Sequence, residues 1–210
     1  MKGREEKNTK RRFAIEALRL FAEKGYESVS VAEIAEAVGC SAPALYKHYK
    51  NKQELLDAII DNSEREFNEH MKIEHAPAED GQEIAQIVLE CSEEEEIAHM
   101  QEVVRGAIHT DTVQWFRKMC VVEQFNMPRL GAIYTYRYIT FQMEQAEKTF
   151  KALIERGKIK NVDPRILARN YLSVPTLCIG MCDREPDREE ECMEIIANHV
   201  REFNKSYRID

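Results

Sequence analysis

The chain has 210 residues, of which 43% are hydrophobic and 32% are charged, and its formal net charge is −8. This is an ordinary balance for a globular protein of one or two domains, and the 8 glycines and 6 prolines are too few for a turn-rich β architecture. No apolar run is long enough to span a bilayer, and none follows the charges of the amino-terminal MKGREEKNTKRR, which excludes a signal peptide. We therefore expect a cytoplasmic protein whose six cysteines are thiols rather than a disulfide framework.

The net charge is unevenly distributed along the chain. Up to Leu55 there are 11 Lys and Arg against 8 Asp and Glu, whereas the remainder carries a balance of −11. A mildly basic amino-terminal quarter on an acidic body indicates that only this quarter meets nucleic-acid phosphate. A chance fluctuation of surface charge would give the same balance.

The first quarter of the chain predicts four helices separated by capping signals. Gly25 ends the first helix by tolerating a left-handed backbone. Ser30 and Glu33 form a capping-box pattern at the start of the second helix, which Gly39 ends. Ser41 is the N-cap of the third helix. We expect helices at 13–24, 31–38, 42–49 and 52–72.

The rest of the chain also predicts helices. Apolar residues recur at helical spacing and no segment shows strand alternation, so we expect an all-α fold. Residues 75–81 break the pattern and predict a loop. Pro128 opens a long helix that Gly157 ends, and Asp163 with Pro164 starts the next one. We expect helices at 82–91, 94–109, 111–125, 128–156, 164–182 and 185–207.

The second and third helices, joined by a glycine-containing turn, have the geometry of a helix-turn-helix. In this motif the first helix braces the second, whose amino-terminal end enters the major groove of DNA. The motif and its flanks, Ala17–Tyr26, Val31–Tyr49 and Lys50–Leu56, resemble the TetR (tetracycline-repressor) family. Small departures are Tyr49, where the family usually has Phe, and Cys40, where a branched apolar residue is common.

The resemblance implies a domain division and a set of DNA contacts. It implies a three-helix helix-turn-helix DNA-binding domain over residues 1–52 and a larger helical domain for ligand sensing and dimerisation over residues 53–210. The implied phosphate contacts are Ser30, Tyr46, His48 and Lys52. The implied contacts to base edges are Ser41, Ala42, Pro43 and Lys47. An arm of Lys10, Arg11 and Arg12 could reach the DNA backbone or minor groove. The alternatives are a packed aromatic for Tyr46 and a solvated face for the lysines.

Two apolar stripes near the carboxyl terminus predict a helical seam. Their gaps of three and four residues are coiled-coil-like and require a partner helix. In the family the last two helices of each subunit form an intersubunit bundle, and a DNA motif of this kind also favours a two-fold dimer. The alternative is that both stripes are buried within one chain. The predicted interface residues are Leu167, Tyr171, Val174, Cys178, Met193, Ile196, Val200, Phe203 and Tyr207.

Large, soft and aromatic residues between 100 and 180 predict an effector pocket. Such side chains from several helices could line an apolar cavity with a few polar tips. The acidic body favours a neutral or cationic effector. Ordinary core packing is the alternative for each residue. The predicted lining is Met100, Val103, Trp115, Phe116, Met119, Tyr134, Tyr138, Phe141 and Leu172.

Enzyme and metal signatures are absent from the sequence. It contains no glycine-rich phosphate loop, Cys-x-x-Cys pair, HExxH or nucleophile elbow, so we expect no enzyme, no cofactor and no metal site. Cys178, Cys182 and Cys192 could hold a soft metal or sense oxidation, although cysteine is also a common buried apolar residue.

The sequence thus predicts a ligand-responsive DNA-binding regulator. We expect a homodimeric repressor that binds a palindromic operator in double-stranded DNA, is released by a small-molecule effector and has no membrane partner. The alternatives are a thiol- or metal-responsive regulator on the same scaffold, an enzyme with an appended helix-turn-helix, and a nucleoid-type DNA binder.

Overall fold

The computed structural model describes the backbone of residues 2–75 and 81–209 and divides into two compact units. Unit 1 comprises Met1–Ile73 and Asp111–Tyr134, and unit 2 comprises Glu74–Thr110 and Thr135–Asp210. The predicted loop at 75–81 lies outside the described residues except at its two ends. The predicted functional boundary between residues 52 and 53 stays a prediction, because these units are defined by contacts and not by function.

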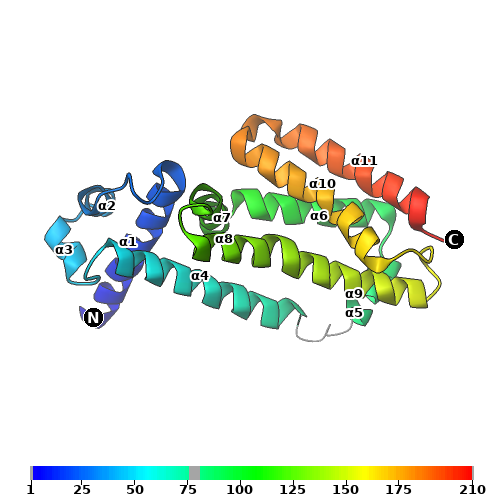
Figure 1. Ribbon diagram of the computed structural model, residues 1–210, viewed down its shortest axis with the longest axis horizontal. Helices are drawn as coiled ribbons and strands as arrows, with labels where there is room; N and C mark the ends of the chain where they lie inside the picture. Colours follow the sequence, from blue (N-terminus) through cyan, green and yellow to red (C-terminus); the bar gives the residue numbers. More distant parts are fainter. Residues whose placement is uncertain (1, 76–80, 210) are drawn as a thin grey trace. The chain divides into compact units, whose positions relative to one another are not determined.

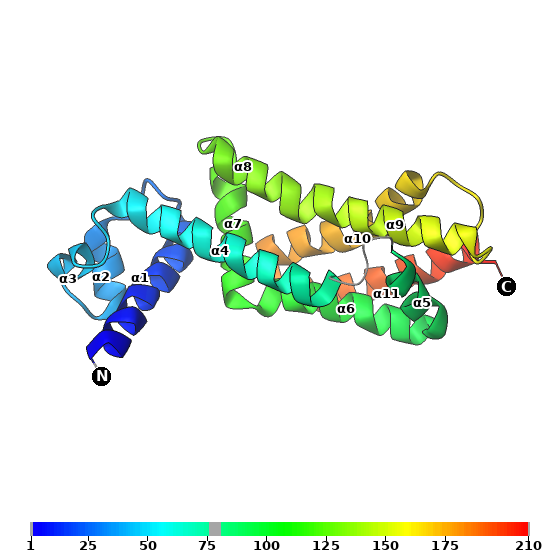
Figure 2. The same cartoon turned by 90° about the horizontal axis from the view of Figure 1, so that it is seen from below.

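Unit 1 contains the helix-turn-helix (Figures 1 and 2). Its helices are α1 (Lys2–Lys24), α2 (Val31–Val38), α3 (Ala42–Tyr46), α4 (Lys52–His75), α7 (Asp111–Glu123) and α8 (Pro128–Thr135). One core joins them, and α1 packs against both α2 and α7. The largest fully buried side chains of this core are Phe13, Phe21, Ile34, Leu45, Leu55, Phe116, Met119 and Leu130. Two helices from the middle of the sequence therefore complete the core of the amino-terminal helices.

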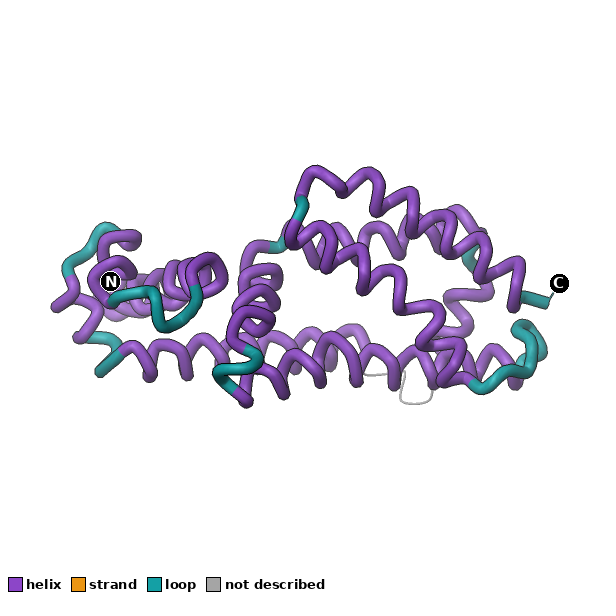
Figure 3. The backbone as a smooth tube through the Cα atoms, turned by 45° about the horizontal axis from the view of Figure 1, so that its top comes forward, coloured by secondary structure: helices purple, strands orange, loops and turns teal. Residues whose placement is uncertain are grey.

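Unit 2 holds the remaining helices. They are α5 (Gln82–Glu90), α6 (Glu93–His109), the π-helical turn η1 (Tyr136–Thr140), α9 (Phe141–Glu155), α10 (Pro164–Arg184), the 3-10 turn η2 (Pro186–Arg188) and α11 (Glu189–Tyr207). Helix α10 packs against α6, α9 and α11. The described backbone contains no strand beyond an isolated bridge between Ile159 and Arg208 (Figure 3), which confirms the all-α prediction.

Several helix boundaries differ from the prediction, among them the start of the last helix, α11, which lies at Glu189 rather than at 185 because a 3-10 turn precedes it. Helix α1 begins at Lys2, well before its apolar face starts at Phe13, because its early residues include Lys, Arg and Glu, which favour helix without an apolar face. Helix α3 ends at Tyr46 rather than Tyr49. The long helix expected at 128–156 is interrupted at Tyr136–Thr140 by the π-helical turn, a feature that apolar periodicity does not reveal. None of the described helices is long and apolar enough to cross a membrane.

Candidate nucleic-acid interface

The start of α2 is fixed by the predicted capping box. The Ser30 hydroxyl accepts from the Glu33 backbone N–H at 3.2 Å, and Glu33 Oε2 accepts from the Ser30 backbone N–H at 2.8 Å. The backbone hydrogen bond from Ser30, with the bond from its hydroxyl, holds the pKa of the Glu33 carboxyl below its ordinary value. The Ser30 hydroxyl also donates to the Glu33 carboxylate at 3.0 Å. To donate to a phosphate instead, the hydroxyl would have to turn its proton away from Glu33.

Helix α3 is short and is held from one side only. Leu45 and Tyr49 are 0% and 2% exposed, and the Tyr49 hydroxyl donates to the Lys10 carbonyl at 3.1 Å. Burial raises the pKa of Tyr49 to about 12. On the other side Tyr46 is 54% exposed, beside exposed Lys47.

The other predicted DNA contacts of the helix-turn-helix lie at the two ends of α3. Ser41 and Pro43 are exposed and Ala42 is half-buried at its start. Ser41 makes no side-chain cap bond, so the helix does not use its hydroxyl. His48 is half-buried, with its ring centroid 5.8 Å from that of Phe13. The predicted base-edge residues thus gather on one short helix and its N-cap, whereas His48 faces partly inward.

Lys52 has a structural role beside its predicted phosphate contact. Its ammonium donates to the carbonyls of Tyr26 at 2.8 Å and Val29 at 3.0 Å, and lies 4.2 Å from the centroid of the Tyr26 ring. An ammonium has three N–H donors, so one remains for a phosphate. Lys52 is also the first residue of α4, whose free backbone amides favour an anion at the same place.

Two residues of the predicted arm of Lys10, Arg11 and Arg12 make contacts within unit 1. Arg12 donates to the Val38 carbonyl at 2.9 Å, and the Lys10 ammonium lies 5.0 Å from the centroid of the Tyr49 ring. Arg11 is exposed. Of the three residues, Arg11 is therefore the one presented to solvent without a contact to the described core.

The nine predicted pocket residues are divided between the two units. Phe116 and Met119 are 2% and 0% exposed within the core of unit 1, against which Trp115 and Tyr134 also pack. Unit 2 holds Met100, Val103, Tyr138, Phe141 and Leu172. Val103 is exposed. Ordinary core packing, the stated alternative, describes Phe116 and Met119, while the effector pocket as a whole stays a prediction.

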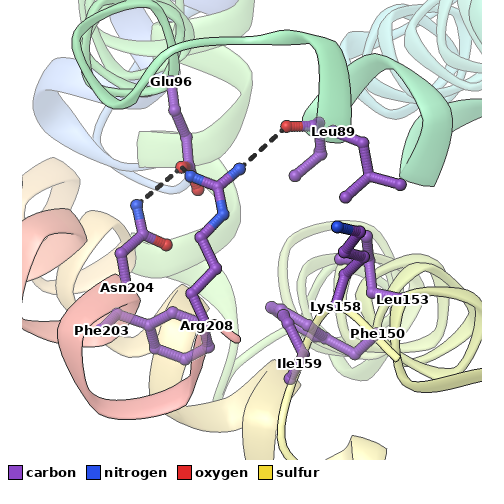
Figure 4. A pocket seen from close by; sticks show the side chains of 10 residues that line it. Leu89, Glu96, Phe150, Leu153, Lys158, Ile159, Phe203, Asn204 and Arg208 are labelled. Carbon is purple, nitrogen blue, oxygen red and sulfur yellow. Dashed lines mark hydrogen bonds and ion pairs between the residues drawn. The ribbon is translucent and has the colours of Figure 1, made fainter. Parts of the chain in front are cut away.

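A small pocket in unit 2 involves none of those nine residues (Figure 4). Its volume is about 20 Å³, which is room for roughly one water molecule. Glu96 accepts from the Tyr171 hydroxyl at 2.8 Å and from Asn204 at 2.9 Å, and Arg208 donates to the Val88 carbonyl at 3.1 Å. Since these polar groups satisfy one another in a space this small, we interpret the pocket as packing rather than as a ligand site.

The predicted dimer stripes are buried within the single chain. Leu167, Cys178, Ile196 and Val200 are each 0% exposed. Met193 and Phe203 are also buried, and Tyr171, Val174 and Tyr207 are half-buried against the same unit. These side chains pack with α6 and α9 of their own chain, which is the alternative that the spacing left open. A dimer through α10 and α11 would have to use the half-buried residues or other faces of these helices.

The cysteines show no bridge and no metal cluster. Cys178, Cys182 and Cys192, with Cys120 of unit 1, are the buried thiols, whereas Cys40 and Cys91 are half-buried. Burial raises the pKa of Cys178 to about 12 and that of Cys182 to about 11. Among the described residues no group of three or more His, Cys, Asp or Glu is placed to hold a metal ion.

Sequence comparison identifies the amino-terminal segment. Residues 16–59 match the family described as bacterial regulatory proteins, tetR family. The HTH-type transcriptional repressor ComR of Escherichia coli is 44% identical over 45 residues, which are 21% of this chain and 21% of ComR. The chain thus aligns with only about a fifth of that relative's length.

Structural comparison extends the likeness to the whole chain. A TetR transcriptional regulator from Chloroflexus aurantiacus has a TM-score of 0.69 at 18% identity and covers 99% of this chain and 100% of its own. A transcriptional regulator from Saccharomonospora viridis in complex with choline has a TM-score of 0.65 at 15% identity, covering 97% and 100%. Likeness at this identity shows the fold alone. The sequence match therefore assigns residues 16–59 to the tetR family, and the structural likeness shows that the whole chain has the fold of these solved regulators.

Proposed function

We propose that this chain is a sequence-specific transcriptional repressor that binds a palindromic DNA operator as a homodimer and is released by a small-molecule effector. The observation that carries the proposal is the exposed face of α3. Tyr46 on α3 and its C-cap Lys47 lie in solvent, while Leu45 on α3 and Tyr49, three residues after the helix ends, are buried in the core. A solvent-exposed tyrosine next to a cation on a braced helix suits a nucleic-acid backbone and groove.

Selection from a random duplex library tests the DNA-binding part. The full chain is incubated with randomised duplexes, the bound pool is sequenced, and affinity for the selected duplex is measured by fluorescence anisotropy. We expect one short palindrome, and Tyr46→Ala should weaken its binding about tenfold, the effect of losing about 1.4 kcal/mol. Tyr136→Ala is the matched control, because Tyr136 is a similarly exposed tyrosine, 52% against 54%, on η1. Broad binding without a palindrome would favour a nucleoid-type binder.

Two arguments support the proposed dimer: the resemblance to the TetR family, and the two-fold symmetry of a palindromic operator. The faces of α10 and α11 that unit 2 leaves in solvent include Ile166 and Leu177, which are 45% and 58% exposed. Leu177→Lys would place a charge on such a face without entering the core. We expect it to convert dimer to monomer in sedimentation equilibrium. A monomeric parent chain would contradict this part of the proposal.

The effector is proposed to be neutral or cationic. The acidic charge of the chain beyond Leu55 supports this, and the Saccharomonospora viridis relative was solved with choline. Choline and a neutral aromatic such as triclosan are suitable first probes. Each would be titrated while DNA release and the emission of Trp115, the one tryptophan of the sequence, are followed together. Release by an anionic probe alone, such as benzoate, would contradict the assignment.

The thiol-responsive alternative receives little support from the geometry. Oxidation requires an accessible thiolate, and burial with a raised pKa keeps Cys178 and Cys182 protonated at neutral pH. Release of DNA by hydrogen peroxide, abolished in the double variant Cys178→Ser with Cys182→Ser, would restore this alternative. An enzyme with an appended helix-turn-helix has no residue cluster in its favour among those described.

A further inference from the structure

We propose that Glu123, at the end of α7, is a positioning residue that fixes the turn at residues 25–29 in front of the helix-turn-helix. The inference rests on the proposed function, because what the turn positions is the DNA-reading part of unit 1. Glu123 is 97 residues from Tyr26 in sequence, yet its Oε1 accepts the Tyr26 backbone N–H at 2.7 Å. The carboxylate is buried, with the residue 4% exposed.

The backbone N–H and carbonyl of Tyr26 are each held by a side chain, and the two side chains are of opposite charge type. Its N–H donates to the carboxylate of Glu123, and its carbonyl accepts from the ammonium of Lys52 at 2.8 Å. Lys52 also holds the Val29 carbonyl at 3.0 Å, directly before the N-cap Ser30. One clamp therefore runs from α7 through the turn to the start of α2 and to the predicted phosphate contact at the start of α4.

The turn packs closely against the end of α7. Gly25 adopts φ +81°, and a Cβ built there would lie 3.2 Å from Glu123 Oε1 and 3.7 Å from Val122 Cγ1. If α7 moved without the turn, a buried carboxylate and a buried N–H would both lose their partner, which is more costly than a movement of the two together. We therefore expect a displacement of α7 to carry the turn, and with it Ser30 and Lys52.

The α7–α8 segment belongs to unit 1, but the chain enters it from unit 2 and leaves it into unit 2. Helix α7 continues directly from α6 of unit 2 at Thr110, and α8 continues into η1 of unit 2 at Thr135. Both ends of the α7–α8 segment are thus bonded to unit 2, while α7 itself packs on α1.

The test uses two variants of Glu123 that separate the length of the side chain from its negative charge. Glu123→Asp keeps the charge but is shorter by one methylene group, so its carboxylate falls short of the Tyr26 N–H. Glu123→Gln loses the charge but keeps an acceptor oxygen at the same reach. We expect Glu123→Asp to bind the duplex selected by the parent chain about tenfold more weakly, the loss of one charged hydrogen bond at about 1.4 kcal/mol. Glu123→Gln should bind within about twofold of the parent.

Matched measurements distinguish positioning from a general loss of stability. Affinity is measured at a temperature at which circular dichroism shows every variant folded, and hydrogen exchange follows the Tyr26 amide. Exchange should accelerate in Glu123→Asp and stay slow in Glu123→Gln. Glu27→Asp and Glu27→Gln are the controls, because Glu27 is an exposed carboxylate in the same turn, and neither should change affinity or exchange.

Several outcomes would overturn the inference. Parent-like affinity of Glu123→Asp, or equal weakening in both Glu123 variants, would show that reach to Tyr26 is not what matters. Fast exchange of the Tyr26 amide in the parent would show that the clamp does not exist. If the parent selects no duplex, the proposed function fails and the DNA-reading role of Glu123 fails with it. Exchange at Tyr26 still reports separately on the clamp.

Discussion

Replacing Lys52 with Met is expected to lower both the stability of the chain and its affinity for DNA. The substitution keeps the apolar stem and removes the ammonium. Two charge-assisted hydrogen bonds are lost, to the carbonyls of Tyr26 and Val29, together with the contact to the Tyr26 ring. Such bonds contribute about 1.5–3 kcal/mol each when buried, but Lys52 is half-exposed and water replaces part of the loss. We expect a net cost of about 2 kcal/mol, which lowers the midpoint of thermal unfolding by about 4–8 °C in a chain of this size.

The DNA effect of the same variant is measured from the salt dependence of binding. Removing one phosphate contact from each of the two subunits of the proposed dimer should lower the slope of log K against log salt by about 1.8. Lys151→Met, which removes an exposed lysine of unit 2, is the control and should change neither the midpoint nor the slope. A lowered midpoint with an unchanged slope would show that Lys52 is only a structural clamp. An unchanged midpoint would refute the reasoning from its carbonyl contacts.

Three further outcomes follow from burial and capping. Ellman's reagent at pH 8 should label Cys40 and Cys91 in the folded chain, and the four buried thiols only after unfolding; rapid labelling of all six would contradict the burial. The contribution of Glu33 to stability should be complete above its unfolded pKa of about 4.3 and be lost as the pH falls through its lower folded pKa. Ser30→Ala removes the hydroxyl bond but keeps the backbone N–H, so it should raise that folded pKa only in part in an NMR titration, and no change would show that the hydroxyl does not contribute. Val200→Glu should unfold unit 2 rather than only split a dimer, because Val200 is 0% exposed within one chain, and a folded monomer in circular dichroism and sedimentation would contradict this.

The sequence was sufficient wherever the signal is local. The Ser30–Glu33 capping box predicts an interaction between residues three apart, and the structure confirms it. Gly25 and Gly39 have the positive φ that their positions at helix ends predict. Tyr46, which the resemblance implies is a phosphate contact, is exposed, as such a contact requires. These features depend on a few neighbouring residues, so one sequence contains the information that they need.

The clamp at Tyr26 could not be predicted in the same way. The apolar pattern of α7 shows which residues face a core, but Glu123 lies on the buried side of that helix and breaks the pattern. The one available signal is a carboxylate on the apolar side of a helix. A buried carboxylate requires a hydrogen-bond donor, but the sequence does not show which group supplies it. The donor is a backbone N–H almost a hundred residues earlier, and backbone donors have no sequence signature. The carbonyl partners of Lys52 are equally absent from the sequence pattern, so the resemblance implies only its phosphate contact.

The predicted seam of α10 and α11 shows what periodicity can and cannot decide. A stripe at gaps of three and four residues establishes that a helix needs an apolar partner, but not which helix supplies it. Here α6 and α9 of the same chain supply it, and Leu167 and Val200 are fully buried as a result. The fully buried members of the stripe are therefore used within the chain, whereas the half-buried Tyr171, Val174 and Tyr207 stay candidates for a two-fold interface together with residues outside the stripe. Those outward positions mix polar side chains with Ile166 and Leu177, which gives no clean period. Such an interface depends on the shape of the folded surface and not on a sequence period. Its residues can be identified only after the residues buried within the chain have been set aside.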